Sequence, residues 1–559
     1  MYHYNVSLIE KRVNPILSWG VAIVTLIITP WTSYDSVNIP RLLALLVMGS
    51  VVFLAAFPEL TTMHKSSFRT TFVLSSFFVL QTILVLIFAP GNKLEQVFGV
   101  QGRQTGFLAY LALVMIFLVA AKVSSVDLFQ QILRVLIITG TLSIIYGFIQ
   151  YAGADPVPWK NPFSPVIGFF GNPNFQSAFM GFSAASLSAF ILSKSTRILW
   201  RILSGIYVIS ALAVITASDS QQGFLVFGFG LSLAILILFF QTQNLRKFRH
   251  LIALGVVVGF LSTMLDILQK SPWQSILYKD SVSYRGDYWR AGWKMTLEHP
   301  FVGVGLDSFR DFYYRSRDLV STTRPAGKNY TDSAHNILLD VSANGGIPFL
   351  VLYFALLILT VLSAVRVLKR TQSFEPFFIA ILVAWVGYTA QSLISINQLG
   401  LAIWGWVTSG LIIGYEVNTR ETTSSQVKPQ PRMGKARKNG NFSIRVAFGL
   451  VLGLTLGLPT YLADADFRSA IKSRNGNKII ATSQKWPQDV IRMNYISGLF
   501  LQNKLPDQAI AVSRDAVKQF PNNYNAWQIL NSIPNSTENE KAKALEMMLK
   551  LNPLYTKFK

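Results

Sequence analysis

The chain contains no cysteine among its 559 residues and only five histidines. The lack of cysteine excludes disulfide bonds, thiolate metal sites and a cysteine nucleophile. Charge is scarce as well, because charged residues make up 14% of the chain and apolar residues 51%. A soluble multidomain protein carries more charge than this. The composition therefore predicts an all-α polytopic membrane protein, since apolar spans in a bilayer fold as helices.

Acidic residues are few, with 27 Asp and Glu against 50 Lys and Arg, and the formal net charge is +23. Basic chains can bind nucleic acid, but here the basic residues stand in short clusters between apolar runs. No nucleic-acid partner is expected, because the grouped aromatic and basic residues of such a face are missing. The clusters are typical of cytoplasmic loops instead. After Lys11 and Arg12 no small-residue cleavage site follows, so the first apolar run is expected to stay.

Long apolar runs predict about thirteen transmembrane helices, since a bilayer core requires about 20 apolar residues per helix. The runs lie near residues 14–32, 41–57, 71–89, 104–121, 127–151, 174–193, 199–217, 222–241, 251–267, 337–365, 376–394, 400–416 and 445–462. Every second connection is rich in Lys and Arg, which places those connections in the cytoplasm. The intervening connections, among them the long segment 268–335, are then expected outside.

These runs divide the chain into four predicted parts. They are a transmembrane domain at 1–416 with a large external loop at 268–335, a basic cytoplasmic linker at 417–444 that includes Arg432 to Lys438, a last transmembrane helix at 445–462, and an extracytoplasmic domain at 463–559. The expected location is the cytoplasmic (inner) membrane, crossed several times, with the C-terminal domain extracytoplasmic.

The last part is soluble in composition and repetitive. Pro487, Pro521 and Pro553 recur at intervals of 34 and 32 residues (487 to 521, 521 to 553). This period is typical of tetratricopeptide helix pairs. About three repeats are needed to bury a continuous core, so the domain is expected to lean on the membrane part or on a partner. It is either a plain helical cap or a surface that binds an acceptor or an envelope protein.

Polar residues that a bilayer tolerates poorly mark candidate sites. Arg103 precedes the fourth predicted span, where snorkelling to lipid headgroups is the plainer explanation. The turn SDSQQ holds Gln221 and Gln222 at the start of another span, where helix capping is the plainer one. Between spans, the segment from Tyr284 to Pro348 is rich in arginine, whose guanidinium fork suits phosphate oxygens.

Within that segment, Arg285, Arg290 and His335 are the residues of interest. Most of its arginines are expected to pair with nearby aspartates. His335 begins a span, where an imidazole can act as a base or a donor near neutral pH, although a lone histidine is more often structural. No cluster of histidines and carboxylates indicates a metal site, and no cofactor is expected.

The motifs FGVQGRQTG, RGDYWRAGWKMTLEHPFVGVGLDSF and HNILLDVSANGGIPFLVL occur in this order. In that order they resemble the O-antigen ligase and polymerase superfamily of bacterial envelope glycosyltransferases, over roughly residues 70–415. The resemblance implies a C-type glycosyltransferase-like membrane fold with a large external loop. It also implies transfer or polymerisation of a glycan from an undecaprenyl diphosphate carrier, without a metal ion, at the outer face of the membrane.

The resemblance also assigns roles to single residues. Arg285 matches an arginine thought to bind the donor diphosphate. Arg103 matches an arginine of an earlier external loop and is expected to help bind that diphosphate. His335 matches a histidine proposed to activate the acceptor hydroxyl or to assist the leaving diphosphate. One position departs from the family: many members have arginine where this chain has Gln221 or Gln222. Gln222 can still donate hydrogen bonds to phosphate, and Arg290 is a candidate substitute for the missing charge.

The expected partners follow from this assignment. They are a lipid-linked glycan donor, a glycan, lipid or protein acceptor, membrane lipids, and an envelope protein that binds residues 463–559. Two other classes of function stay open. A flippase or transporter of lipid-linked glycan predicts charged residues along a pathway and repeated halves. A scaffold predicts that the role is lost when the C-terminal domain is deleted.

Overall fold

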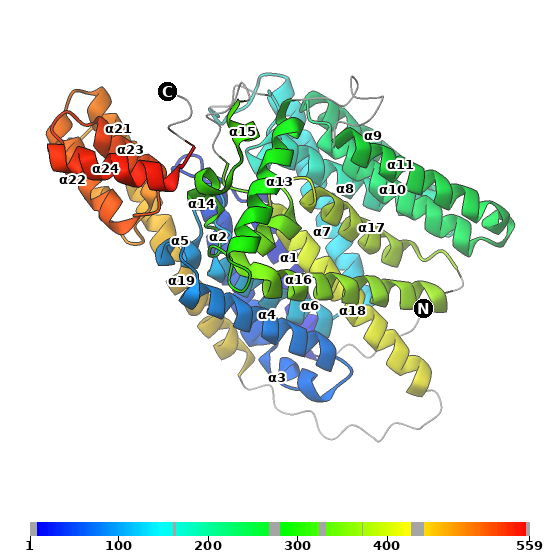
Figure 1. The fold of residues 1–559 in the computed structure, drawn as a ribbon. Coiled ribbons are helices and arrows are strands. Elements are labelled where there is room, and N and C mark those ends of the chain that lie inside the picture. Colours follow the sequence, from blue (N-terminus) through cyan, green and yellow to red (C-terminus); the bar gives the residue numbers. More distant parts are fainter. Residues whose placement is uncertain are drawn as a thin grey trace.

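The computed structural model describes residues 8–159, 164–267, 280–323, 331–371, 373–425 and 441–554. Within these ranges every regular element is a helix and no strand occurs, which confirms the all-α prediction. The part predicted to cross the membrane forms one bundle, and the last helices of the chain lie together at one end of it (Figure 1).

All thirteen predicted spans contain a helix. These helices are α1 (Leu8–Leu26), α2 (Asn38–Ala55), α4 (Arg69–Phe88), α6 (Phe107–Lys122), α7 (Val126–Tyr151), α8 (Pro173–Leu192), α9 (Ile198–Ala217), α10 (Gln222–Gln241), α11 (Arg249–Ile267), α16 (Ile337–Arg370), α17 (Pro376–Ser392), α18 (Leu399–Ser425) and α19 (Phe442–Ser473). In the part of the chain that the structure describes, nine helices are long and apolar enough to cross a membrane. The helices α6 and α17 are apolar but shorter, and α1 and α11 are not in either group.

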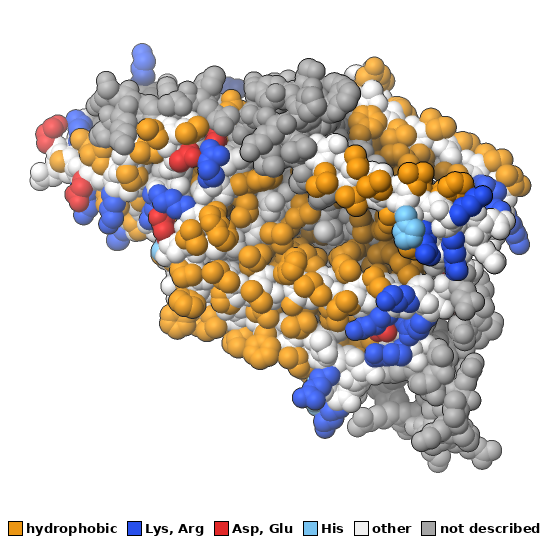
Figure 2. Space-filling model, turned by 45° about the vertical axis from the view of Figure 1, so that its right-hand side comes forward, with side chains coloured by type: hydrophobic (Ala, Val, Ile, Leu, Met, Phe, Trp, Pro, Cys, Tyr) orange, Lys and Arg blue, Asp and Glu red, His pale blue; other side chains and the backbone are white. Residues whose placement is uncertain are grey.

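Hydrophobic side chains cover a broad band across the face of the molecule seen in Figure 2. Exposed residues such as Ile87, Phe88 and Ile209, which are 57%, 67% and 71% accessible, belong to these helices. In the same view Lys and Arg gather below and to the right of the band, and acidic and basic side chains mix at the upper left. A protein whose middle lies in a bilayer shows this distribution.

Further helices, most of them short, connect the spans. They are α3 (Phe57–Leu60), η1 (Met63–Lys65), α5 (Lys93–Phe98), η2 (Gly168–Phe170), η3 (Gln243–Phe248), α13 (Asp280–Glu298), α14 (Phe309–Ser316) and α15 (Leu319–Thr323). Much of the predicted loop at 268–335 is therefore helical, because apolar residues of α13 and α14 share a small core. Residues 268–279 and 324–330 of that loop lie outside the described residues, as does the linker stretch with Arg432 to Lys438.

Several span ends differ from the sequence prediction. Helix α1 is Leu8–Leu26 where 14–32 was predicted, and α16 ends at Arg370, beyond residue 365. Helix α18 continues beyond residue 416 to Ser425, and α19 continues beyond residue 462 to Ser473. The change from apolar to polar residues ended the predicted spans, but nothing at those positions breaks a helix. A change of solvent along a helix leaves its backbone hydrogen bonds intact.

Helix α16 is kinked at Gly346, where the residues that follow α13 pack against its backbone. Gly346 has φ +79°, and a Cβ there would lie 2.5 Å from the carbonyl carbon of Phe301. Only glycine fits this close approach of two backbones. The backbone N–H of Ile347 donates to the carbonyl of Pro300 at 2.7 Å, and Val304 N–H donates to Ala343 at 2.8 Å. The residues after α13 are thereby fixed against the first turns of α16.

Five helices close the chain. They are α20 (Gly476–Ser483), α21 (Val490–Gln502), α22 (Pro506–Gln519), α23 (Tyr524–Ser532) and α24 (Glu538–Leu551), and they share a hydrophobic core with the end of α19. We call them the C-terminal helices. They lie at the upper left in Figure 1, beside α5, α14 and α19.

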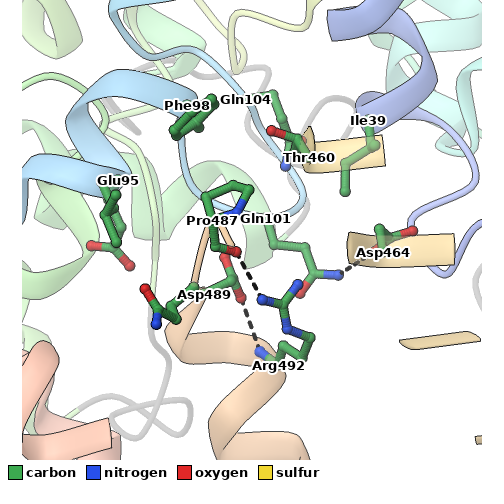
Figure 3. Close-up of a pocket in the computed structure, with 13 residues that line it drawn as sticks. Ile39, Glu95, Phe98, Gln101, Gln104, Thr460, Asp464, Pro487, Asp489 and Arg492 are labelled. Atoms are coloured by element: carbon green, nitrogen blue, oxygen red, sulfur yellow. Dashed lines mark hydrogen bonds between the residues drawn. The ribbon is translucent and has the colours of Figure 1, made fainter. Parts of the chain in front are cut away.

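The C-terminal helices are fastened to the rest of the chain by side-chain contacts. Asn92 Nδ2 donates to the carbonyl of Gln519 at 2.7 Å, and Arg317 donates to Asn552 at 3.1 Å. Close to this junction, Gln101 donates to Asp464 at 3.1 Å (Figure 3). The expectation that this part of the chain leans on the membrane part agrees with these contacts.

Candidate active site

Asp307, in the turn before α14, is the centre of a buried hydrogen-bond network. Its side chain accepts hydrogen bonds from the backbone N–H of Val100 at 2.8 Å and of Thr105 at 3.0 Å. The hydroxyl of Thr105 donates to it at 2.8 Å, and Nε of Arg103 lies 3.2 Å away. The carboxylate of Asp307 therefore holds the loop between α5 and α6 against the turn between α13 and α14.

Arg103 extends this network to the residues before α16. Its side chain is buried, and it donates to the backbone carbonyl of Asp332 at 2.7 Å. The carboxylates of Asp332 and Asp340 each lie 3.8 Å from the guanidinium. Burial disfavours the charge, but these carboxylates and Asp307 outweigh it and raise the pKa of Arg103. Its charge is thus matched inside the protein.

The backbone around His335 is held by the same network. Asp340 accepts hydrogen bonds from the hydroxyl of Ser333 at 2.6 Å and from the N–H of Ala334 at 2.8 Å. The Ser333 hydroxyl in turn accepts the N–H of His335 at 2.9 Å. His335 has φ +54°, a left-handed conformation that costs free energy in a residue other than glycine. A strained residue held this firmly is typical of a functional site.

The imidazole of His335 is kept neutral. Burial, and next the positive charge of Arg285, lower its pKa to about 4, although Asp332 acts in the opposite direction. Its Nδ1 lies 3.2 Å from the carbonyl oxygen of Ser333. If Nδ1–H donates there, which is an assignment from the surroundings, Nε2 carries the lone pair. The ring of Tyr288 lies beside it, with centroids 5.4 Å apart.

Arg285 lies on α13, one turn before Tyr288. Among the described residues it has no carboxylate partner, and its buried Nε has no hydrogen bond. Burial lowers its pKa to about 10, so the guanidinium is still charged at neutral pH. A cation that is buried without a partner is costly, and a bound anion would compensate it. Of the predicted arginines, Arg285 is the one whose charge is not already matched.

Arg290 is placed differently. Its guanidinium is half exposed and pairs with Asp287 and with Asp318, the latter with Nε and Oδ2 2.6 Å apart. This is the loop salt bridge expected of most arginines in the segment. A role for Arg290 in donor binding stays a prediction, and one that would require these pairs to open.

Gln222 belongs to a different polar turn from the one that holds His335. It begins α10, where its side-chain N and O atoms are both buried and have no hydrogen-bond partner among the residues described. The preceding turn is fixed by Ser220, which donates to Asn174 at 2.8 Å and accepts from Ser177 at 2.9 Å. Capping of α10 was considered for the whole turn from Ser218 to Gln222. Gln221, the N-cap residue, makes no side-chain cap, and the side chain of Gln222 has no hydrogen-bond partner among the residues described.

A cleft of about 850 Å³ opens beside His335. Tyr288, Asp332 and His335 line one wall, and residues of α21 and α23 line the other. The volume lies in the range of pockets that hold small ligands. A ligand in the cleft would meet the neutral imidazole and the C-terminal helices together.

Two carboxylates in the last part of α19 are engaged with protein groups. Asp464 and Asp466 lie two residues apart on α19. Asp464 accepts from the backbone N–H groups of Tyr34 and Asp35, at 2.6 and 3.0 Å, and Asp466 pairs with Lys485 at 2.8 Å. In the described part of the chain, no group of three metal-binding side chains is found.

The geometry can be set against known families. The family model described as O-antigen ligase matches residues 206–354. No curated protein matches the chain. The matched segment runs from α9 into α16 and includes Gln222, Arg285 and His335, whereas Arg103 and the C-terminal helices lie outside it. The match supports the resemblance to the O-antigen ligase superfamily and indicates glycan transfer or ligation at a membrane.

Some residues of the site were not singled out by the sequence. Asp332 and Ser333 set the position of His335, and Tyr288 flanks its ring. The signal available was the run TDSAHN, in which small polar residues precede the helix start. Such residues favour local side-chain to backbone hydrogen bonds.

Removing the centre of the network should destabilise the protein. We expect Asp307→Ala to lower the free energy of unfolding by about 3–5 kcal/mol, because it leaves the buried charge of Arg103 less compensated and buried N–H groups unpaired. Thermal unfolding of the purified protein in detergent measures this. Asp318→Ala, which removes a half-exposed pair, should change it by less than about 1 kcal/mol. Equal losses in the two variants would contradict a central role for Asp307.

The lowered pKa of His335 predicts an unusual pH profile. A base must be unprotonated, and a histidine with a pKa of about 4 stays unprotonated far below the ordinary value of 6.5. The acid limb of kcat/KM should therefore fall near pH 4, with little loss between pH 7 and 5. In Arg285→Gln the limb should move toward neutral pH, because a positive charge that lowers the pKa is removed. Residual transfer measured across this range tests both statements.

Proposed function

We propose that the protein transfers a glycan from an undecaprenyl diphosphate carrier to an envelope acceptor at the outer face of the cytoplasmic membrane. The observation that carries the proposal is the pairing of a neutral, partly buried His335, which lines a cleft, with Arg285, a cation that has no carboxylate partner among the described residues. Transfer from a diphosphate needs a base for the acceptor and positive charge for the leaving group. The family match over residues 206–354 supports the same class of reaction.

In the proposed step, a hydroxyl oxygen of the acceptor attacks the anomeric carbon of the donor sugar. The new glycosidic C–O bond forms as the bond between that carbon and the diphosphate oxygen breaks, and the configuration inverts. The hydroxyl proton passes to Nε2 of His335 and then to water. The bonding electrons leave with undecaprenyl diphosphate, whose growing negative charge Arg285 meets. Arginine thus does the work that a metal ion does elsewhere.

Arg103 takes a positioning role in this proposal. Its guanidinium already faces the carboxylates of Asp307, Asp332 and Asp340, so a second anion would gain little from it. Through its hydrogen bond to Asp332 it holds the segment on which His335 lies. The geometry leaves Arg285 as the proposed ligand of the donor diphosphate.

Transport of lipid-linked glycan is the alternative function. A transporter is expected to carry buried charged residues along a path through its helices. Asp340 is such a residue by position, but its carboxylate is bound to Ser333 and Ala334 and faces Arg103. It serves the network around His335, which favours a transferase.

Mass spectrometry of envelope glycans tests the proposal in cells. A strain that lacks the protein should accumulate lipid-linked glycan on the outer face of the membrane and should lose one glycan product. The wild-type chain should restore that product, and the His335→Ala chain should not. Accumulation of the donor on the inner face instead would favour the transporter.

A further inference from the structure

The second wall of the cleft has a chemistry of its own. It is formed by α21 and α23, and its polar members include Asn494, Tyr495, Asn525 and Gln528. None of the described lining residues on these two helices carries a charge. The cleft is therefore polarised, with charged and titratable groups around His335 on one wall and neutral amides with an aromatic ring on the other.

Two of these amides are free to bind a ligand. Asn525 and Gln528 lie three positions apart on α23, which places them on the same face of the helix. Asn525 is partly exposed and Gln528 is exposed, and neither side chain has a hydrogen-bond partner among the residues that the structure describes. On α21, the ring of Tyr495 is 42% accessible. The two amides line the cleft without an evident structural task, whereas the ring of Tyr495 also packs on those of Tyr34 and Phe467, with centroids 5.6 and 5.8 Å apart.

The neighbouring Asn523 does have a structural task. Its Nδ2 donates to Asp311 at 2.8 Å, and its Oδ1 accepts the N–H of Ala526 at 3.0 Å and a bond from Asn494 at 3.2 Å. It therefore pins α23 to α14 and ties α23 to α21. The second wall is held in register with the wall that carries His335, as a preorganised binding site requires.

We infer that this second wall binds an uncharged stretch of carbohydrate on the acceptor, so that the acceptor is itself a glycan. A side-chain amide both donates and accepts hydrogen bonds, as a sugar hydroxyl does, and an exposed tyrosine ring offers a flat apolar face. A diphosphate requires cations, which this wall lacks, so the donor phosphates belong near Arg285. The inference rests on the proposed transfer function and adds the acceptor class, which the C-terminal helices select.

Binding to the full-length protein in detergent micelles tests the inference. The probe is a set of neutral oligosaccharides, released by mild acid from envelope polysaccharides of the producing cell and separated by size. Calorimetry measures the affinity of each fraction. We expect the wild type to bind at least one fraction, and Asn525→Ala/Gln528→Ala to bind it about tenfold more weakly, since two neutral hydrogen bonds are lost.

The matched control removes two amides of the same kinds that lie outside the cleft, one on α21 and one on α23. Gln502 ends α21 and Asn531 lies near the end of α23, and neither lines the cleft. Gln502→Ala/Asn531→Ala should bind the oligosaccharide as the wild type does. Equal binding by this control and by Asn525→Ala/Gln528→Ala would overturn the inference.

Two further arms separate the inference from the proposed function. His335→Ala should lose glycan transfer but still bind the oligosaccharide. Oligosaccharide binding that is lost in Asn525→Ala/Gln528→Ala supports the inference even if the wild type proves unable to transfer. Wild-type protein that transfers glycan yet binds no fraction would overturn the inference alone. Displacement of the oligosaccharide by inorganic pyrophosphate, with loss of pyrophosphate binding in Asn525→Ala/Gln528→Ala, would show an anion site and would also overturn it.

Discussion

We expect the His335→Ala protein to transfer glycan about 10²–10⁴ times more slowly than the wild type, the range that a positioned general base contributes. The reason is that His335 offers an unprotonated imidazole at the cleft, with its Nδ1 turned to the carbonyl of Ser333. Single-turnover transfer from lipid-linked glycan by purified protein measures the loss. A loss in this step with donor affinity unchanged would mark a base rather than a binding group.

His299 supplies the matched control. It follows α13, its ring lies 6.1 Å from that of Phe312, and it does not line the cleft. His299→Ala should therefore leave the transfer rate within a few-fold of the wild type. Both variants are first compared by thermal unfolding, so that a folding defect is not mistaken for a catalytic one. Undiminished transfer by a folded His335→Ala protein would remove His335 from the mechanism.

The second large effect belongs to Arg285. We expect Arg285→Ala to slow transfer by about 10²–10³-fold, the loss seen when one group that stabilises developing charge is removed. Arg285 has no carboxylate partner among the described residues, and its buried Nε has no hydrogen bond, so a leaving diphosphate would find its charge available. Arg285→Lys should recover part of the rate, since lysine keeps the charge but lacks the planar fork. Transfer assays at saturating donor measure both variants.

Arg290→Ala is the control for this prediction. Arg290 is on the same helix, but Asp287 and Asp318 already match its charge at the surface. Its removal should change the transfer rate by only a few-fold. The reverse order, with Arg290→Ala slow and Arg285→Ala active, would mean that the surface pairs open and that Arg290 binds the donor.

The helices were well predicted because the backbone hydrogen bonds of a membrane-spanning helix form within the span and its surface must be apolar. A run of about 20 apolar residues is sufficient for that prediction. The ends of α18 and α19 were harder, since a helix continues past the apolar run when no glycine or proline stops it. The helices α13 and α14 were missed for a different reason. Their apolar residues pack on each other and on α16. The segment is so polar overall that its sequence predicts a loop.

The site was predictable in part. Motif resemblance indicated His335 and Arg285, but the difference between Arg285 and Arg290 depends on which carboxylates surround each one. Arg103 meets Asp332 across 229 positions of the chain, and such a contact has no local signal. The lowered pKa of His335 likewise arises from burial in the folded protein. The second wall of the cleft exists only because the C-terminal helices fold back onto α14.

The most direct test of the central claim follows the carrier itself. Purified protein in micelles, supplied with lipid-linked glycan labelled in both the glycan and the carrier, receives envelope oligosaccharide as acceptor and a chelator of divalent cations. The account predicts one undecaprenyl diphosphate released for each glycan joined to acceptor, at a rate that the chelator does not change and that His335→Ala lowers by about 10²-fold or more. A donor that stays intact with wild-type protein, or release that is equal in His335→Ala, would contradict it.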